Sequence, residues 1–393
     1  MKQFNFMTSK FCCVFDIEIT NIFAKSENEN PISVSKCFVK ENVSENNGRL
    51  VCASKICMTI TEIDFKVFSQ FYSWEQIRIG KMICYRKEYL PTEFVLSILH
   101  LYEMKTKLKG VKGKEVEYLN SKEMLNSCYG MCVTNPLRDE ILCDGENWDV
   151  EHLTGAKQLE MLNKYNESKN RFLFYPWGIY VTAYARRNLF TGISECGDDY
   201  IYSDTDSVKI MNGDAHKEYF KLYNDLAQQK LRAACKFHKI PFEKVEPVTI
   251  KGIAKPLGVW DYEGRYRRFK TLGAKRYMIE EENALTVNGK NYNYSMTVSG
   301  VNKKTAIPYM LETFGEKGIF DAFTNYLDIH PTATGKNIHT YIDYEQTGTI
   351  KDYKGVISSY DTVTGVHLEP TGYTLSLSVL YINYLMGIRL KKE

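Results

Sequence analysis

Helix and strand patterns are interspersed irregularly along this 393-residue chain, and this order limits the possible folds more than any other feature of the sequence. Residues 12–20, "CCVFDIEIT", alternate between apolar and polar side chains, which is typical of a half-buried strand. Residues 91–110 and 176–197 instead place apolar side chains at helical spacing. The regular strand and helix alternation that a parallel sheet needs is missing. The sequence therefore predicts an α+β fold rather than a doubly wound sheet.

Several further elements can be predicted around these. Residues 91–110 and 115–131 are expected to form a helical hairpin, because the lysine-rich turn "KGVKGK" joins two helical patterns. Residues 137–170 are polar and weakly patterned, which indicates an insertion. The other expected elements are a strand over 51–60, a short helix over 61–74, a strand pair over 201–210, a helix near 215–238, strands around 247–280 and a hairpin that turns at Asn288 and Gly289.

Composition excludes several classes of protein. The chain has 51 Lys and Arg against 48 Asp and Glu, so its net charge of +3 argues against a uniformly basic nucleic-acid sleeve and against an acidic tail. Eleven cysteines without C-x-x-C spacing indicate free thiols in a reducing compartment and no zinc site. The start lacks the apolar run of a signal peptide, and residues 374–388 are too short and polar to span a bilayer. We expect a soluble intracellular protein without membrane contact.

Two carboxylates stand two residues apart in "YSDTDS", residues 202–207, where a strand would normally carry packing groups. On a hairpin, Asp204 and Asp206 can approach each other, and their charges repel unless a cation lies between them. Mg²⁺ suits such a pair, because it binds through one or two carboxylates and completes its shell with water and phosphate. The plain alternative is an ordinary acidic turn. A calcium loop is excluded, since the following Asp-Gly and the distal Glu are both absent.

A second short motif lies on the second arm of the predicted helical hairpin. In "KEMLNSCYG", residues 122–130, Lys122, Asn126 and Tyr129 share one helical face. A lysine on that face can neutralise a triphosphate, and a tyrosine can wall a sugar and base. Taken alone, the same residues would be an ordinary solvated helix face.

Two basic motifs lie further along the chain. In "TAYAR", residues 182–186, Thr182 and Arg186 are one helical turn apart. In "KRY", residues 275–277, Lys275 and Tyr277 would project from the same side of a strand. The preceding segment 264–270, "GRYRRFK", interleaves four cations with two aromatic residues, as a phosphate-tracking surface would.

These four motifs, in this order over about residues 105–280, resemble those of family B DNA polymerases. "YSDTDS" looks like motif C, "KEMLNSCYG" like motif B, "TAYAR" like the T-x-x-A-R element and "KRY" like the K-x-Y motif. In detail the chain resembles the protein-primed subgroup of bacteriophages. The resemblance implies a right-hand architecture with an antiparallel palm sheet, helical-hairpin fingers and a small thumb. It assigns residues 1–90 to palm strands with an element like the terminal-protein region, 91–136 to fingers, 137–174 to an insertion like the strand-displacement element, 175–285 to palm and 286–393 to thumb.

The resemblance also implies an activity and a set of site residues. The activity is nucleotidyl transfer to a primer 3′-hydroxyl or a terminal-protein hydroxyl with two Mg²⁺ ions, which Mn²⁺ could replace. Expected partners are primer-template DNA, dNTPs and a terminal protein, in the host cytoplasm if the chain is viral. Asp204 and Asp206 would bind metal and act in catalysis with Lys122. The nucleotide would be bound by Lys122, Asn126, Tyr129 and either Lys105 or Lys107, and DNA by Gly130, Thr182, Arg186, Tyr202, Lys275 and Tyr277.

One part of the family's pattern cannot be found. Two-metal catalysis needs a second carboxylate strand, which the family supplies as motif A, D-x-x-S-L-Y-P, before motif B. The chain therefore resembles a C-terminal portion that begins past motif A, and we expect either a split enzyme, whose second chain carries motif A and the exonuclease domain, or a defective product. Two other functions stay open. One is a non-catalytic DNA-binding or terminal-protein-binding fragment, and the other is a 3′–5′ exonuclease centred on Asp16 and Glu18 in "FDIE". The "GDD" at 197–199 imitates an RNA polymerase signature, but we expect a turn there.

Overall fold

The computed structural model describes residues 2–26, 29–143, 148–169, 174–287, 290–351, 355 and 357–375. The chain divides into two compact units, of which the first comprises residues 1–45 and 49–261 and the second residues 46–48 and 262–393. This division lies inside the segment 175–285 that the sequence assigns to a palm, and the predicted domain boundaries stay predictions. Each unit is described by itself.

The first unit begins with an antiparallel sheet built around one long strand. Strand β1 (Phe11–Ala24) pairs on one side with β4 (Arg49–Thr61) and on the other with β5 (Tyr72–Arg86). The short strands β2 (Val39–Glu41) and β3 (Ser44–Asn46) both pair with β4, and helix α1 (Lys2–Lys10) precedes β1. Alternate β1 side chains from Cys13 to Ile19 are buried, whereas Asp16 and Glu18 between them are half-buried. The predicted half-buried strand is confirmed.

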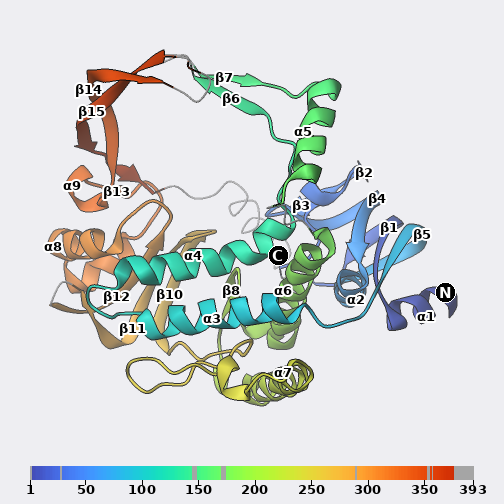
Figure 1. The fold of residues 1–393 in the computed structure, drawn as a ribbon. Helices are drawn as coiled ribbons and strands as arrows, with labels where there is room; N and C mark the ends of the chain where they lie inside the picture. The colour runs from blue at the N-terminus through green and yellow to red at the C-terminus, as the bar shows by residue number, and fades with distance from the viewer. Residues whose placement is uncertain are drawn as a thin grey trace. The chain divides into compact units, whose positions relative to one another are not determined.

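Two helices supply apolar groups to the buried face of this sheet. Helix α2 (Glu62–Phe71) connects β4 to β5, and helix α6 (Tyr175–Cys196) lies beside it (Figure 1). Val67 and Phe68 of α2 and Phe190 and Ile193 of α6 belong to the same apolar core as the inward residues of β1. Because a sheet with one apolar face must be covered, this packing places α6 against the sheet.

Strand β5 is not among the predicted elements, although it is 15 residues long. Its pattern is weak, because Ile77 and Ile79 are followed by a change of phase at Gly80 and Lys81 before Met82 and Cys84. The register with β1 shifts at the same place, between Phe15 and Ile17. A bulge of this kind interrupts the two-residue period on which strand prediction rests.

The predicted helical hairpin is confirmed. Helices α3 (Thr92–Leu108) and α4 (Glu115–Cys132) run side by side in opposite directions (Figure 1). Gly110 and Gly113 adopt positive φ angles of 78° and 79° in the connecting turn, a conformation that glycine adopts without strain. Only Leu99 and Thr106 of α3 and Ser121 and Cys132 of α4 are buried, so both helices keep broad polar faces.

The remaining elements of the first unit follow the predicted order with one exception. The segment after the α3–α4 hairpin forms β6 (Glu140–Cys143), β7 (Trp148–Glu151) and α5 (Gly155–Glu167), and α5 has no buried residue. The turn η2 (Gly197–Asp199) follows α6, strands β8 (Tyr200–Asp204) and β9 (Ser207–Ile210) form a hairpin, and η3 (Gly213–His216) leads into α7 (Lys217–His238). The 3-10 helices η1 (Val34–Lys36) and η4 (Phe242–Val245) complete the unit.

The prediction of strands around 247–280 was wrong for residues 247–265. The structure has a single bridge there, between Val248 and Ala254, and regular pairing begins only at Tyr266. Gly252 and Gly258 both have a φ of 75°, a left-handed conformation that interrupts an extended strand.

The second unit is built on a three-stranded antiparallel sheet. Its strands are β10 (Tyr266–Gly273), β11 (Arg276–Val287) and β12 (Lys290–Val298), and helix α8 (Lys303–Ala322) packs on them through Ile307 and Met310. The turn predicted at Asn288 and Gly289 lies outside the described residues, although the flanking Val287 and Lys290 are paired. The other elements are β13 (Asp328–Ile329), α9 (Pro331–Thr334), β14 (Asn337–Lys351), β15 (Ile357–Pro370) and β16 (Tyr373–Thr374).

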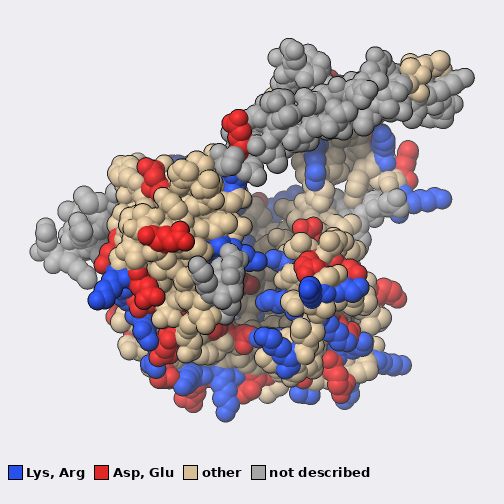
Figure 2. Space-filling model, turned by 90° about the vertical axis from the view of Figure 1, so that its left-hand side faces the viewer, with Lys and Arg blue, Asp and Glu red and all other residues tan. Residues whose placement is uncertain are grey.

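The surface carries mixed charge. Figure 2 shows Lys and Arg side chains interspersed with Asp and Glu over the visible face, rather than one continuous basic surface. Ten cysteines within the described ranges are free thiols. Within the described ranges, no helix combines the length and the apolar character needed to cross a bilayer.

Candidate active site

The two aspartates of "YSDTDS" lie at the tip of the β8–β9 hairpin. Asp204 pairs with Ser207, so Thr205 and Asp206 form a two-residue turn. Thr205 has a φ of 58°, which a β-branched residue rarely adopts, and the backbone N–H of Asp206 donates to the Asp204 carbonyl at 2.7 Å. A backbone of this kind costs on the order of 1–3 kcal/mol and is typical of functional sites. The tight turn keeps both carboxylates at one point of the chain.

These carboxylates have the chemistry of a hard-metal site. Asp206 is exposed, whereas Asp204 is half-buried and its Oδ1 accepts a hydrogen bond from Thr205 Oγ1 at 2.9 Å. Two carboxylates with open space around one of them suit Mg²⁺, which keeps water and phosphate oxygens in its shell. In the described part of the chain, no three His, Cys, Asp or Glu side chains are grouped so as to hold a metal. The turn therefore offers two carboxylates.

Lys105 of the helical hairpin lies within electrostatic range of both Asp206 and Lys122. Burial lowers the pKa of Lys105 on α3, and the positive charges of Lys109 and Lys122 lower it further, while the Asp206 carboxylate acts in the opposite direction. Lys107 is occupied elsewhere, since its ammonium group lies 2.5 Å from a carboxylate oxygen of Glu103. Of the two lysines that the sequence left open, the structure brings Lys105 to Lys122 and Asp206.

The predicted face of α4 is exposed. Lys122, Asn126 and Tyr129 all have open side chains, and 45% of the Tyr129 surface is accessible. The C-terminal end of α4 packs closely on the start of α6, because a Cβ on Gly178 would lie 2.2 Å from Val133 Cγ1. At Gly130, in contrast, an added Cβ would meet nothing within 4 Å.

Helix α6 carries the "TAYAR" residues, and its two predicted DNA ligands differ in what holds them. Thr182 Oγ1 donates to the Ile179 carbonyl at 2.8 Å, so its proton is used within the helix. Arg186 forms two hydrogen bonds with Asp64 of α2, from Nε at 2.9 Å and from Nη2 at 3.1 Å. Tyr202, from the neighbouring hairpin, is half-buried on β8 opposite Lys209.

Sequence reasoning missed the acidic partners of α6. Glu62 Oε2 accepts hydrogen bonds from the Cys13 backbone N–H at 2.9 Å and from the Tyr180 hydroxyl at 2.5 Å. Burial and the hydrogen bond to Glu62 raise the pKa of Tyr180 far above its ordinary range. The only available signal was the capping-box pattern T-x-x-D at residues 61–64, which predicts the start of α2 but not its partner helix.

The K-x-Y residues belong to the second unit and need one correction. Lys275 lies in the turn between β10 and β11 with a φ of 54°, so the expectation that it shares the side of a strand with Tyr277 was wrong. Tyr277 is on β11 and stacks on Phe269 of β10, with ring centroids 5.5 Å apart.

In the basic segment that precedes the K-x-Y residues, two of the four cationic side chains are paired with other groups of the chain. Arg268 is paired with Glu280 and Lys270 Nζ donates to the carbonyls of Phe320 and Asp321, whereas Arg265 and Arg267 are exposed.

The acids of the exonuclease alternative have structural partners. Asp16 accepts a hydrogen bond from Thr59 Oγ1 at 2.5 Å, and Glu18 forms an ion pair with Lys55 at 3.0 Å. The hydrogen bond from Lys55 lowers the pKa of Glu18. This arrangement is an ordinary polar sheet face. The "GDD" segment is a turn, as expected, in which Asp199 lies 2.9 Å from His216 Nε2.

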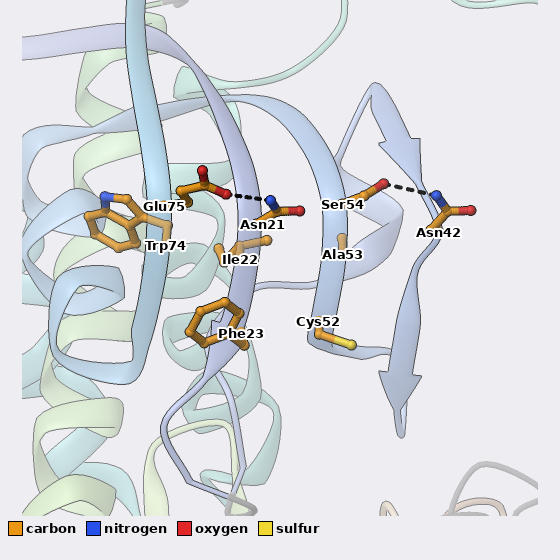
Figure 3. Close-up of a pocket in the computed structure, with 9 residues that line it drawn as sticks. All are labelled: Asn21, Ile22, Phe23, Asn42, Cys52, Ala53, Ser54, Trp74 and Glu75. Carbon is orange, nitrogen blue, oxygen red and sulfur yellow. Dashed lines mark hydrogen bonds between the residues drawn. The ribbon is translucent and has the colours of Figure 1, made fainter.

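A shallow pocket of about 680 Å³ opens on the N-terminal sheet (Figure 3). Side chains of β1, β4 and β5 line it, together with Asn42, and Asn21 donates to Glu75 across its edge. None of the predicted site residues lines this pocket, so it is separate from the candidate active site.

Comparison with known proteins agrees with these motifs. No protein-family profile matches the chain. The DNA polymerase of Bacillus phage B103 is 25% identical over 275 residues, which cover 69% of this chain and 40% of that protein. The DNA polymerase of Bacillus phage Nf is 27% identical over 206 residues, which cover 52% of this chain and 29% of that protein. The chain thus spans less than half the length of these curated relatives.

The fold agrees as well. The orthorhombic crystal form of phi29 DNA polymerase matches with a TM-score of 0.50 and 15% identity, over 93% of this chain and 51% of that one. The phi29 polymerase complexed with primer-template DNA and incoming nucleotide substrates gives the same values. In sequence this chain is therefore similar to part of the DNA polymerases of these Bacillus phages, and its α+β fold is similar to about half of the phi29 DNA polymerase.

Proposed function

We propose that this chain is the palm, fingers and thumb portion of a protein-primed family B DNA polymerase. It would transfer deoxynucleotides to a primer 3′-hydroxyl or to a terminal-protein hydroxyl. The observation that carries the proposal is that Lys105 of α3 lies within electrostatic range of both Lys122 of α4 and Asp206 of the β8–β9 turn. Phosphoryl transfer needs cations beside the acidic metal ligands, and this arrangement supports such a site.

Each group has a role that follows from its chemistry. Lys105 and Lys122 would neutralise the triphosphate, since an ammonium group acts as a compact positive charge toward phosphate. The lowered pKa of Lys105 reflects burial first and then two positive neighbours, and an incoming polyanion would relieve the repulsion from those neighbours. Asn126 and Tyr129, exposed on the same face of α4, would border the sugar and base.

Asp204 and Asp206 would hold Mg²⁺, with Mn²⁺ as a substitute. When bound, two such ions stabilise the attacking and leaving oxygens of the displacement. The carboxylates provide two ligands at the tip of one turn, so we propose that a second chain supplies the third carboxylate as motif A, together with the exonuclease domain. Thr182, Arg186, Tyr202, Gly130, Lys275 and Tyr277 are the proposed DNA contacts.

The test is primer extension by the full chain with Mg²⁺ or Mn²⁺, alone and after addition of a candidate chain that carries motif A. We expect Asp206→Asn to reduce extension by at least about 100-fold, because it removes a metal ligand and a charge at the reacting phosphate. Asp198→Asn is the matched control, since Asp198 is also exposed and lies eight residues earlier in the same region. Extension that persists in Asp206→Asn would contradict the assignment of the aspartates.

A second candidate function is a non-catalytic DNA-binding fragment. The absence of a third acidic side chain near the turn, among the residues that the structure describes, favours it. It predicts that primer-template binding is unchanged by EDTA and by Asp206→Asn, and that no motif A chain restores extension. Restored extension with a partner would exclude this function.

A further inference from the structure

Asp64 is a buried acid whose oxygens are all engaged. Its side chain is 5% exposed, and it accepts hydrogen bonds from Thr61 Oγ1 at 2.8 Å and from two nitrogens of Arg186. The Arg186 side chain on the other side of this pair is 40% exposed. One partner is therefore fixed inside the protein, while the other reaches solvent.

The pair leaves a defined part of the guanidinium available. Asp64 uses Nε and Nη2, and the described residues give Nη1 no hydrogen-bond partner. A guanidinium has five N–H donors in a rigid plane, so fixing one edge also fixes the direction of the donors that remain. These donors are the ones suited to a phosphate oxygen.

The next residue shows that this support is specific. Arg187 lies over the Tyr184 ring at 4.7 Å and donates to the Asn188 side chain, which is a neutral partner from the same helix. Arg186 instead depends on a carboxylate from another helix, α2. A buried carboxylate is costly unless it is paired, so the Asp64 site is stable only with the cation in place.

We infer that Asp64 is a positioning residue for DNA binding: it orients the Arg186 guanidinium so that Nη1 meets a backbone phosphate of the primer-template. This inference rests on the proposed function. Because the Asp64 carboxylate neutralises the charge of the Arg186 guanidinium, it contributes direction rather than attraction. An arginine without such a partner would lose rotamer freedom on binding, and preorganisation removes that cost.

The test measures binding of a labelled primer-template to the full chain by fluorescence anisotropy at several salt concentrations. The variants are Asp64→Asn, Arg186→Gln and the double variant, with urea unfolding of each. If Asp64 acts through Arg186, each single variant weakens binding by about 10-fold, and the double variant is no weaker than Arg186→Gln alone. The slope of log affinity against log salt falls by about one in Arg186→Gln and in the double variant, because both lack the guanidinium that contacts the phosphate.

Glu62→Gln is the matched control. Glu62 is equally buried on the same helix but holds Tyr180 and the Cys13 backbone rather than an arginine. This variant should lower the urea midpoint as Asp64→Asn does, yet keep affinity within about 2-fold of the unsubstituted chain, because no DNA ligand depends on it. A merely structural role of Asp64 predicts that both variants behave alike in binding.

A second variant keeps the test decisive if Asp64→Asn folds poorly. Arg186→Lys retains the charge but cannot bind two oxygens in one plane. Binding close to that of Arg186→Gln supports the inference, whereas binding like the unsubstituted chain overturns it. Additive losses in the double variant, or tighter binding by Asp64→Asn, overturn it as well. An unsubstituted chain that fails to bind primer-template rejects the proposed function itself, whereas binding with additive losses rejects only the role of Asp64.

Discussion

At the scale of single residues, the candidate site combines groups whose charges oppose one another. Burial and the positive charges of Lys109 and Lys122 lower the pKa of Lys105, and the Asp206 carboxylate only partly offsets this effect. Positive groups assembled without a matching acid are typical of sites that bind anions. The sequence predicted Lys122 and named Lys105 as one of two options, but it could not distinguish Lys105 from Lys107, because the choice depends on which of the two side chains of α3 lies toward Lys122 and Asp206.

The lowered pKa of Lys105 predicts a pH dependence of nucleotide binding. Only the charged ammonium attracts a triphosphate, and its pKa in the free chain lies below the ordinary 10.5, so affinity should fall as pH rises through that lowered pKa. Arginine stays charged throughout this range. We therefore expect Lys105→Arg to bind dNTP with a flatter alkaline profile, measured by equilibrium titration. A profile that stays unchanged in this variant would exclude Lys105 as the titrating group.

At the scale of elements, the long helices were predictable and the contacts between them were not. Helices α3, α4, α6 and α7 were predicted to within two residues of their observed bounds, whereas β5 contains a bulge that hides its period. Helix α1, residues 2–10, was not predicted either, because its pattern is short and polar. The acids of α2 illustrate the limit well: Glu62 and Asp64 look like a helix start in the sequence, and only the fold provides Tyr180 and Arg186 as partners.

The close approach of α4 and α6 predicts a stability effect at Gly178. Alanine there would place its Cβ 2.2 Å from Val133 Cγ1, so Gly178→Ala should cost about 1–3 kcal/mol of unfolding free energy despite the better helix propensity of alanine. Urea unfolding of Gly178→Ala in the Val133→Ala background should recover most of this loss, because the clashing methyl group is gone. Gly130→Ala, which meets nothing within 4 Å, should instead stabilise the chain by up to about 1 kcal/mol. Equal effects at the two glycines would show that packing between the helices is not the cause.

At the scale of the whole molecule, the small net charge does not show which basic side chains are paired within the chain and which are exposed to solvent. Several basic groups are already paired with protein, including Arg268 with Glu280 and Lys107 with Glu103. Others, such as Arg265 and Arg267, are exposed on β10 or just before it. Charge counts from the sequence could not separate these two classes, since pairing is decided by the register of β10 with β11.

This division predicts which arginines contribute to the salt dependence of DNA binding. Arg265→Ala and Arg267→Ala should each lower the slope of log affinity against log salt by about one, if each exposed guanidinium neutralises one phosphate. Arg268→Ala should leave the slope unchanged and lower the urea midpoint, because it removes an internal ion pair. Anisotropy titrations over a range of salt concentrations compare the three variants directly. A slope lowered most by Arg268→Ala would reverse this assignment.

Helix α6 has 22 residues and is therefore about 33 Å long. Near its start and in its middle, Tyr180 and Arg186 form hydrogen bonds with Glu62 and Asp64 of α2. At its far end, three residues connect it to strand β8, which ends at Asp204. A helix of this length moves as a stiff rod rather than bending freely. A partner that binds the N-terminal sheet and displaces α2 would consequently rotate α6 and move the aspartate turn. Helix α6 thus couples the position of that sheet to the candidate active site.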